Sequence, residues 1–149
     1  GARNNQALAC LIGPDGLPEV ERMCKEFPDT PVIIDHLARI GADGPIRDAD
    51  VDLLCSLAKH KKVMVKVGAF YALGKKQAPY TDLAPMIKKV VLAFGPQRCM
   101  WESDCPFQVQ GEHTYQASID LVLRRLDFLS ADDKDWLLRK TAENFFFAK

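Results

Sequence analysis

Short apolar runs alternate with amphipathic stretches along most of the chain. The runs are nearly continuous in apolar residues and rich in Val and Ile, which is typical of strands buried on both faces. Turn-forming residues such as Gly13-Pro14 separate them. We therefore predict four strands, at residues 7–12, 32–34, 63–67 and 99–101.

Stretches with apolar residues at helical spacing follow the strands. Asp48 or Asp50 is expected to cap the second helix, and Ser130 with Asp133 three positions later resembles a capping box. Four strand-helix repeats indicate one α/β domain with a parallel sheet and right-handed crossovers. The other helices are predicted at residues 17–27, 83–94, 114–129 and 131–147, with loops at 41–47 and 68–80.

The composition favours a small-molecule substrate over larger partners. The 149 residues, 48% of them hydrophobic, suffice for one sizeable core. Lys plus Arg equals Asp plus Glu at 20 each, and no basic stripe is interleaved with aromatic residues, so we expect no nucleic acid partner. No apolar stretch approaches the roughly 18 residues of a membrane span, so no membrane partner is expected either.

Five cysteines are scattered along the chain without a Cys-x-x-Cys pair. This odd number argues against a disulfide framework or a structural zinc site and favours a reducing cytoplasm. Cys99 and Cys105 flank the fourth predicted strand, where small apolar fillers are a better interpretation than thiol nucleophiles.

Two predicted strands end on side chains that can transfer protons or bind metal. Residues 32–34 run into Asp35 and His36, and the fourth strand runs into Asp104 shortly before Pro106. Parallel α/β proteins place their chemistry at the carboxyl ends of strands, so Asp104 and His36 are expected to share one edge. Asp104 is either a turn residue or a metal ligand or general base, and His36 is either a structural imidazole or a ligand.

Two basic residues are further candidates for substrate contact. Lys66 lies near the end of an apolar strand, so its ammonium must face the mouth of the site or pair with a carboxylate. Arg39, in the loop after His36, can meet an anionic substrate. His60 and His113 favour structural roles. Without a Gly-rich phosphate loop or a Gly-x-Ser-x-Gly motif, phosphoryl transfer and serine hydrolase chemistry are disfavoured.

Several motifs together resemble the amidohydrolase-related family. They are Asp35-His36 with Gly41 five residues later, Val63 to Gly68, Ser103-Asp104-Cys105-Pro106, and an Asn144 before two phenylalanines. The resemblance extends from about Leu17 onward. It is closest to the branch that contains dicarboxylate lactonases, L-fuconolactonase-like enzymes and aminocarboxymuconate semialdehyde decarboxylase.

The resemblance implies a (β/α)₈ barrel with its active site at the carboxyl ends of the strands. His36 would be the histidine of strand six, a contact for substrate or water or a metal partner. Asp104 would be the aspartate of strand eight, a metal ligand or general base. Trp101 and Phe107 would shape the mouth of the site. The implied cofactor is a divalent metal, Zn or Mn, which this chain alone would bind weakly or lack.

The chain also departs from the family pattern. The His-x-His pair of the first strand is absent, and the predicted fifth strand offers Cys10 in place of a histidine. A barrel needs about 250 residues, so residues 1–149 are expected to form the C-terminal half of a TIM barrel, strands five to eight with their helices. Such a chain is a fragment, an incomplete gene model or a truncated descendant. Its open edges would need a missing N-terminal half or a homo-oligomer to cover them.

The expected function is hydrolysis of a small lactone or carboxylated substrate by an activated water molecule. Asp104 would act as the base, and His36 would help to polarise the substrate carbonyl or to orient the water molecule. Alternatives are a non-oxidative decarboxylase on the same scaffold and a non-catalytic half-barrel. A separation of Asp104 and His36 within about 8 Å would suit a shared water or metal ion.

Overall fold

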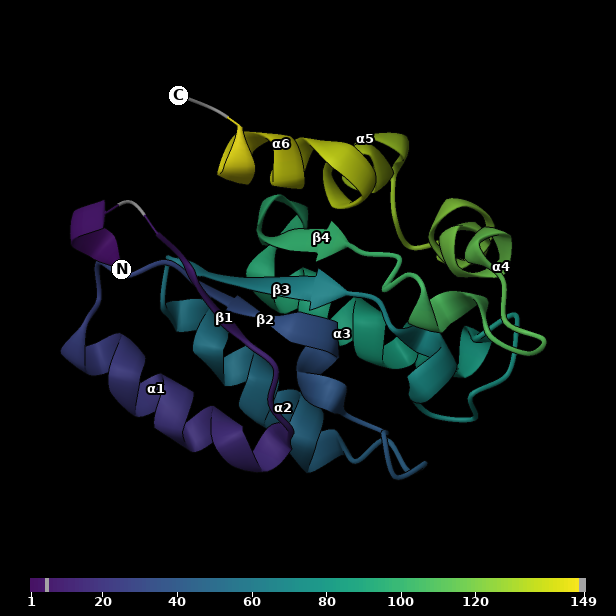
Figure 1. Ribbon diagram of the computed structural model, residues 1–149, viewed down its shortest axis with the longest axis horizontal. Coiled ribbons are helices and arrows are strands. Elements are labelled where there is room, and N and C mark those ends of the chain that lie inside the picture. Colours follow the sequence, from purple (N-terminus) through teal and green to yellow (C-terminus); the bar gives the residue numbers. More distant parts are fainter. Residues whose placement is uncertain (5, 148–149) are drawn as a thin grey trace.

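One parallel sheet forms the centre of the molecule. The computed structural model describes residues 1–4 and 6–147. Neighbouring strands follow in chain order, β1-β2-β3-β4, and each pair is parallel (Figure 1). All four carboxyl ends therefore lie at the same edge. The strands are β1 (Leu8–Cys10), β2 (Val32–Ile34), β3 (Val63–Val67) and β4 (Cys99–Trp101).

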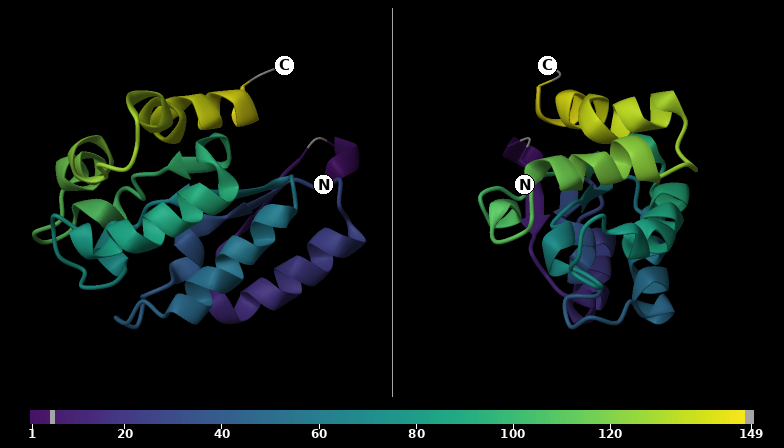
Figure 2. Two further views of the ribbon diagram at one scale, coloured as in Figure 1. Left: turned by 180° about the vertical axis from the view of Figure 1, so that it is seen from behind. Right: turned by 90° about the vertical axis from the view of Figure 1, so that its right-hand side faces the viewer.

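The three helices that connect the strands cover one face of the sheet, as the rear view in Figure 2 shows. The C-terminal helices lie beside β4 instead (Figure 1). The helices are α1 (Leu17–Glu26), α2 (Asp48–Ser56), α3 (Ala84–Phe94), α4 (Tyr115–Asp120), α5 (Ala131–Asp135) and α6 (Thr141–Phe146). This arrangement confirms the prediction of four parallel βα units with a C-terminal helix.

Side chains of the strands alternate between a helix face and an opposite, inner face. The three valines of β3 pack among the helices in the main core. Met64 points to the inner face, where it forms a separate small cluster with Ile33 of β2 and Met100 of β4. Phe145 of α6 packs against this cluster. The chain's own last helix thus covers part of the inner face.

The start of α2 differs from its prediction. Asp48 is the first helical residue, and the preceding Arg47 makes no side-chain capping hydrogen bond. Asp48 and Asp50 lie in the first turn, where the helix dipole favours negative charge without a cap. The first strand is also shorter than predicted, since only Leu8–Cys10 pairs with β2.

The two C-terminal helical segments change geometry along their length. After α4 the chain continues as a π-helical turn (Leu121–Arg125), and another π-helical turn (Trp136–Lys140) joins α5 to α6. The predicted capping box at the start of α5 is confirmed, because Ser130 and Asp133 cap each other's backbone. Within the described ranges, no helix has both the length and the apolar character that a membrane crossing requires.

Candidate active site

Polar side chains gather where the strands end. Lys66 is the fourth residue of β3, Asp35 and His36 follow β2, and Glu102 and Asp104 follow β4. The exposed fractions of these five side chains lie between 14% (Asp35) and 28% (Lys66), so all are largely shielded from water. With Tyr71 they make contact with one another. We call this set the carboxyl-edge cluster: Asp35, His36, Lys66, Tyr71, Glu102 and Asp104.

A left-handed backbone turn aims His36. Residues 36–39 all have φ between +52° and +53°, a conformation that costs an L-residue about 1–2 kcal/mol. Leu37 and Ala38 hold the turn in place, because both are fully buried in the core. Asp104 has φ +52° as well. Strain of this kind persists where the surrounding structure enforces it, and it is common at functional sites.

His36 lies between two carboxylates. Its Nδ1 donates a hydrogen bond to Glu102, and its Nε2 is 3.9 Å from Oδ1 of Asp104. The second separation is too long for a hydrogen bond but suits two groups that share one water molecule. The two residues predicted to meet at the strand ends are therefore neighbours.

The carboxylates favour the protonated form of His36. The hydrogen bond to Glu102 raises the pKa of His36 above its ordinary value of 6.5, although burial acts in the opposite direction. The negative charges of Glu102, Asp104 and Asp35 add to the rise. When protonated, the ring donates from both nitrogens, so Nε2 becomes a donor on the side of Asp104.

Lys66 joins the neighbouring strands through ion pairs. Its Nζ lies 2.9 Å from Oδ1 of Asp35 and 3.4 Å from Oε2 of Glu102. Burial by itself lowers the pKa of this ammonium, but the hydrogen bond to Asp35 and the charge of Glu102 outweigh it and leave the pKa raised. Lys66 is therefore charged at neutral pH, and both of its partners are carboxylates of this chain.

Tyr71 orients the carboxylate of Asp104. The phenol donates a 2.9 Å hydrogen bond to Oδ2, which leaves Oδ1 on the side of His36. Burial, together with the hydrogen bond to Asp104, raises the pKa of Tyr71 to about 12. The phenol thus remains a hydrogen-bond donor throughout the physiological pH range.

Glu102 reaches His36 only because Gly68 has no side chain. A Cβ atom at position 68 would lie 2.3 Å from Cγ of Glu102 and 2.5 Å from its carbonyl oxygen. Neither distance is compatible with a methyl group. Gly68 follows β3 directly, so a glycine on one strand makes room for the carboxylate of the next.

Three predicted contact residues lie outside the cluster. Trp101 faces the helix side, where it packs against the main core and meets the ring of Tyr115 edge-on at 5.5 Å. Strand alternation explains this placement, because Met100 and Trp101 must point to opposite faces. Phe107 is 55% exposed, and Arg39 is exposed on the left-handed turn. None of the three contacts His36, although the charge of Arg39 acts on the phenol of Tyr71.

The cluster does not supply a full set of ligands for the divalent metal, Zn or Mn, that the sequence suggested. Within residues 1–4 and 6–147, no group of three or more His, Cys, Asp and Glu side chains is arranged to hold a metal ion. Only Nε2 of His36 and Oδ1 of Asp104 face each other, while Nδ1 is engaged by Glu102. A catalytic zinc site usually takes three protein ligands, so this chain alone does not complete one.

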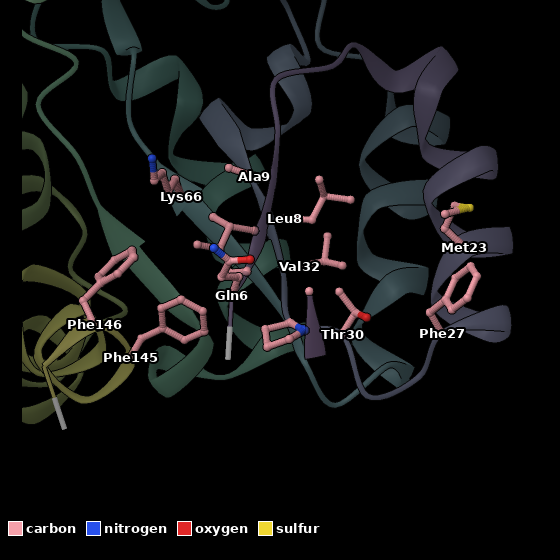
Figure 3. A pocket seen from close by; sticks show the side chains of 14 residues that line it. Gln6, Leu8, Ala9, Met23, Phe27, Thr30, Val32, Lys66, Phe145 and Phe146 are labelled. Carbon is pink, nitrogen blue, oxygen red and sulfur yellow. The ribbon is translucent and has the colours of Figure 1, made fainter. Parts of the chain in front are cut away.

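A large cavity lies away from this chemistry. Its volume is about 1010 Å³, and it extends along β1 between α1 and α6 (Figure 3). Met23 and Phe27 line one side and Phe145 and Phe146 the other. Lys66 is the only member of the carboxyl-edge cluster among its lining residues. The cavity is lined mostly by apolar residues, and it meets the carboxyl-edge cluster at Lys66.

Sequence reasoning did not single out Glu102 or Tyr71 as site residues, and it placed Asp35 at the end of a strand without giving it a role. Alternation along β4 contains the signal for Glu102, since a residue two positions after Met100 returns to the inner face. Asp35 occupies the equivalent place after Ile33. Tyr71 has no such signal, because it lies in the loop after β3.

The comparisons with known proteins agree with this geometry. The family model described as Amidohydrolase matches residues 10–148. An L-fucono-1,5-lactonase from Burkholderia ambifaria is 27% identical over 103 residues, 67% of this chain and 34% of the relative. A 4-sulfomuconolactone hydrolase from Rhizobium radiobacter is 28% identical over 78 residues, 52% of this chain and 26% of the relative.

Solved structures share the fold over almost the whole chain. An amidohydrolase from Burkholderia multivorans, solved with bound zinc, superimposes with a TM-score of 0.85 at 22% identity, covering 96% of this chain and 53% of that one. A Pseudomonas putida protein described as a 2-pyrone-4,6-dicarboxylic acid hydrolase gives 0.82 at 22% identity, with 97% and 53% covered. The chain thus spans about half the length of these structures and about a third or less of the curated relatives.

Proposed function

The chain belongs to the amidohydrolase family, and we propose that it forms one side of the active site of a hydrolase that opens a small lactone with an activated water molecule. One observation carries the proposal. Nε2 of His36 and Oδ1 of Asp104 lie 3.9 Å apart at the carboxyl edge of the sheet, where one water molecule can contact both.

In the proposed reaction Asp104 is the general base. It takes a proton from the bridging water as the water oxygen bonds to the lactone carbonyl carbon. His36, held by Glu102, donates from Nε2 to the oxygen that gains negative charge. The ring C–O bond then breaks, and the leaving oxygen takes from Asp104 the proton that came from the water, which restores the carboxylate. Tyr71 keeps Asp104 oriented throughout.

These steps use only side chains of this chain. No step is assigned to a metal ion, because the described part of the chain contributes two donors to a site that usually needs three. Lys66 and Asp35 do not enter the reaction directly. Their ion pair fixes the end of β3 against the end of β2, beside the reacting groups.

The names of the relatives favour hydrolysis over decarboxylation. Both curated relatives are named for opening a lactone. One structural neighbour is named for hydrolysing a 2-pyrone, which is also a cyclic ester. The competing interpretation is a half-barrel without catalytic activity, in which the carboxyl-edge cluster has only a structural role.

Hydrolysis by the wild-type protein and by Asp104→Asn separates these interpretations. With D-glucono-1,5-lactone as probe, we expect the substitution to lower the rate at least about 100-fold, the usual contribution of a general base. Asp52→Asn on the exposed face of α2 is the matched control and should keep the full rate. Full activity of the Asp104 variant would remove this residue from the mechanism, and an inactive wild-type protein would favour the non-catalytic half-barrel.

A further inference from the structure

We infer that this site prefers a neutral, hydroxylated lactone to a lactone that carries a carboxylate or sulfonate, and that Glu102 determines the preference. The inference rests on the proposed function, because it assumes that a lactone is the substrate. It adds that the lactone is uncharged and that Glu102 is the residue that selects against a charged one.

The first argument is the balance of charge in the carboxyl-edge cluster. Three carboxylates, of Asp35, Glu102 and Asp104, face two basic groups, the ammonium of Lys66 and the ring of His36. Even with His36 protonated, the cluster retains one net negative charge. All five side chains are at most 28% exposed, so water screens this charge only in part.

The second argument is that Lys66, the shielded lysine of the cluster, is already paired. Lys66 contacts both Asp35 and Glu102, and Arg47, in the loop before α2, pairs with Asp43 at 2.6 Å. Arg39 is exposed on the left-handed turn, where water screens its charge, although that charge still acts on the phenol of Tyr71. In the described part of the chain, no shielded cation is left at this edge to receive an anionic group of a substrate.

The third argument is the count of hydrogen-bonding positions. Three carboxylates offer about twelve lone-pair positions, whereas Lys66, protonated His36 and Tyr71 supply about six N–H and O–H donors. Among the hydrogen bonds of residues 1–4 and 6–147, no backbone N–H donates to these three carboxylates. The site therefore has acceptors to spare. Hydroxyl groups on a lactone ring supply the missing donors, and a carboxylate or sulfonate on the ring adds further acceptors.

Glu102 is the member that decides the charge. Its Oε1 accepts from His36 and its Oε2 lies 3.4 Å from Lys66, so one carboxylate contacts both of the groups that would otherwise attract an anion. Gly68 leaves the space that this side chain occupies on the side of β3. Replacing this carboxylate by a neutral amide of the same shape leaves Lys66 with one carboxylate partner in place of two, so its ammonium is expected to be more available to an anionic substrate.

The test compares two lactones with the same ring. D-Glucono-1,5-lactone is neutral, and D-glucaro-1,5-lactone carries a carboxylate in place of its terminal hydroxymethyl group. The wild-type protein should hydrolyse the neutral lactone with the higher kcat/KM. In Glu102→Gln the ratio of the two kcat/KM values should shift about tenfold toward the anion, because one nearby negative charge is gone. The control is Glu26→Gln, the same chemical change at an exposed glutamate that ends α1, and it should leave the ratio unchanged.

A binding measurement keeps the test independent of turnover. The corresponding 1,5-lactams resist hydrolysis, and their binding is followed by chemical-shift changes of the His36 ring. Tighter binding of the neutral lactam supports the preference even if neither lactone is hydrolysed, in which case only the proposed function fails. Equal or tighter binding of the anionic lactam, no binding of either, or a ratio that Glu102→Gln does not move would each overturn the inference.

Discussion

Glu102 accepts a hydrogen bond from Nδ1 of His36, although 66 positions separate the two residues in the chain. The contact spans from the end of β4 to the end of β2 and passes over Gly68 after β3. It links three of the four strands at their carboxyl edge. Much of what we expect from variants of this protein follows from this contact.

Replacing Glu102 by Gln should make stability depend differently on pH. The pKa of His36 is raised in the folded protein, so the folded state binds more protons, and the contact stabilises most below the ordinary pKa of 6.5. That contribution disappears as the pH rises through the raised pKa. We expect Glu102→Gln to lower the free energy of unfolding by about 1–3 kcal/mol near pH 5.5, and by less near pH 9. Some loss persists there, since Lys66 is still charged.

Urea unfolding at the two pH values measures this difference, and NMR titration follows the ring directly. The chain has only three histidines, so the signal of His36 can be assigned by substitution. The midpoint of His36 should fall in the variant, because the hydrogen bond to Glu102 is what raises its pKa most. A midpoint of His36 that does not move would contradict the role given to Glu102.

Gly68→Ala should destabilise the fold and disturb the site together. The added Cβ would lie 2.3 Å from Cγ of Glu102, and overpacking of this kind costs about 1–3 kcal/mol. The neighbouring Ala69→Gly is a control of opposite sign, because φ at Ala69 is +54° and glycine adopts that value without strain. Denaturant unfolding should give Gly68→Ala a clearly lower free energy of unfolding than Ala69→Gly. Equal values would argue against the close approach of Glu102 to position 68.

Phe145→Ala should uncover the inner face. Phe145 packs against Ile33, Met64 and Met100 and is itself only partly buried, so we expect a loss of about 1–3 kcal/mol, less than a fully buried phenylalanine would give. Phe147→Ala is the matched control, because Phe147 is 78% exposed. It should change the free energy of unfolding by less than about 0.5 kcal/mol. Sedimentation should also show more self-association for the Phe145 variant. Identical behaviour of the two variants would mean that α6 does not protect the cluster.

Ser130→Ala should cost about 1 kcal/mol through the loss of a helix cap. The hydroxyl of Ser130 accepts from the backbone N–H of Asp133 at the start of α5. Ser56→Ala is the control, because Ser56 lies at the end of α2 and donates only to the carbonyl of Leu53. Thermal unfolding compares the two, and similar midpoints would show that the capping box contributes little.

The strand positions could be predicted closely from the sequence. β2, β3 and β4 begin and end at the predicted residues, because their apolar runs stop at charged or turn-forming residues that cannot enter a buried sheet. The same reasoning brought His36 and Asp104 to one edge. Local sequence was sufficient wherever burial alone decided the outcome.

The remaining features depend on contacts between distant segments. Glu102 acquires its role from the space left at Gly68, which the sequence of β4 does not reveal. Trp101 was expected at the mouth because of its motif, but alternation turns it toward the helices. The π-helical turns after α4 and α5 also have no local signal, since their sequences suit an ordinary α-helix.

The turn at residues 36–39 has a consequence for anyone who wants a more heat-resistant protein. Four successive left-handed residues cost the fold several kcal/mol, at about 1–2 for each, and Ala38→Gly would recover part of that sum. The same glycine would also loosen the backbone that holds the imidazole of His36 next to Asp104. Thermal stability and the fixed orientation of His36 therefore compete within these four positions. A variant that raises the melting temperature should also be assayed for activity.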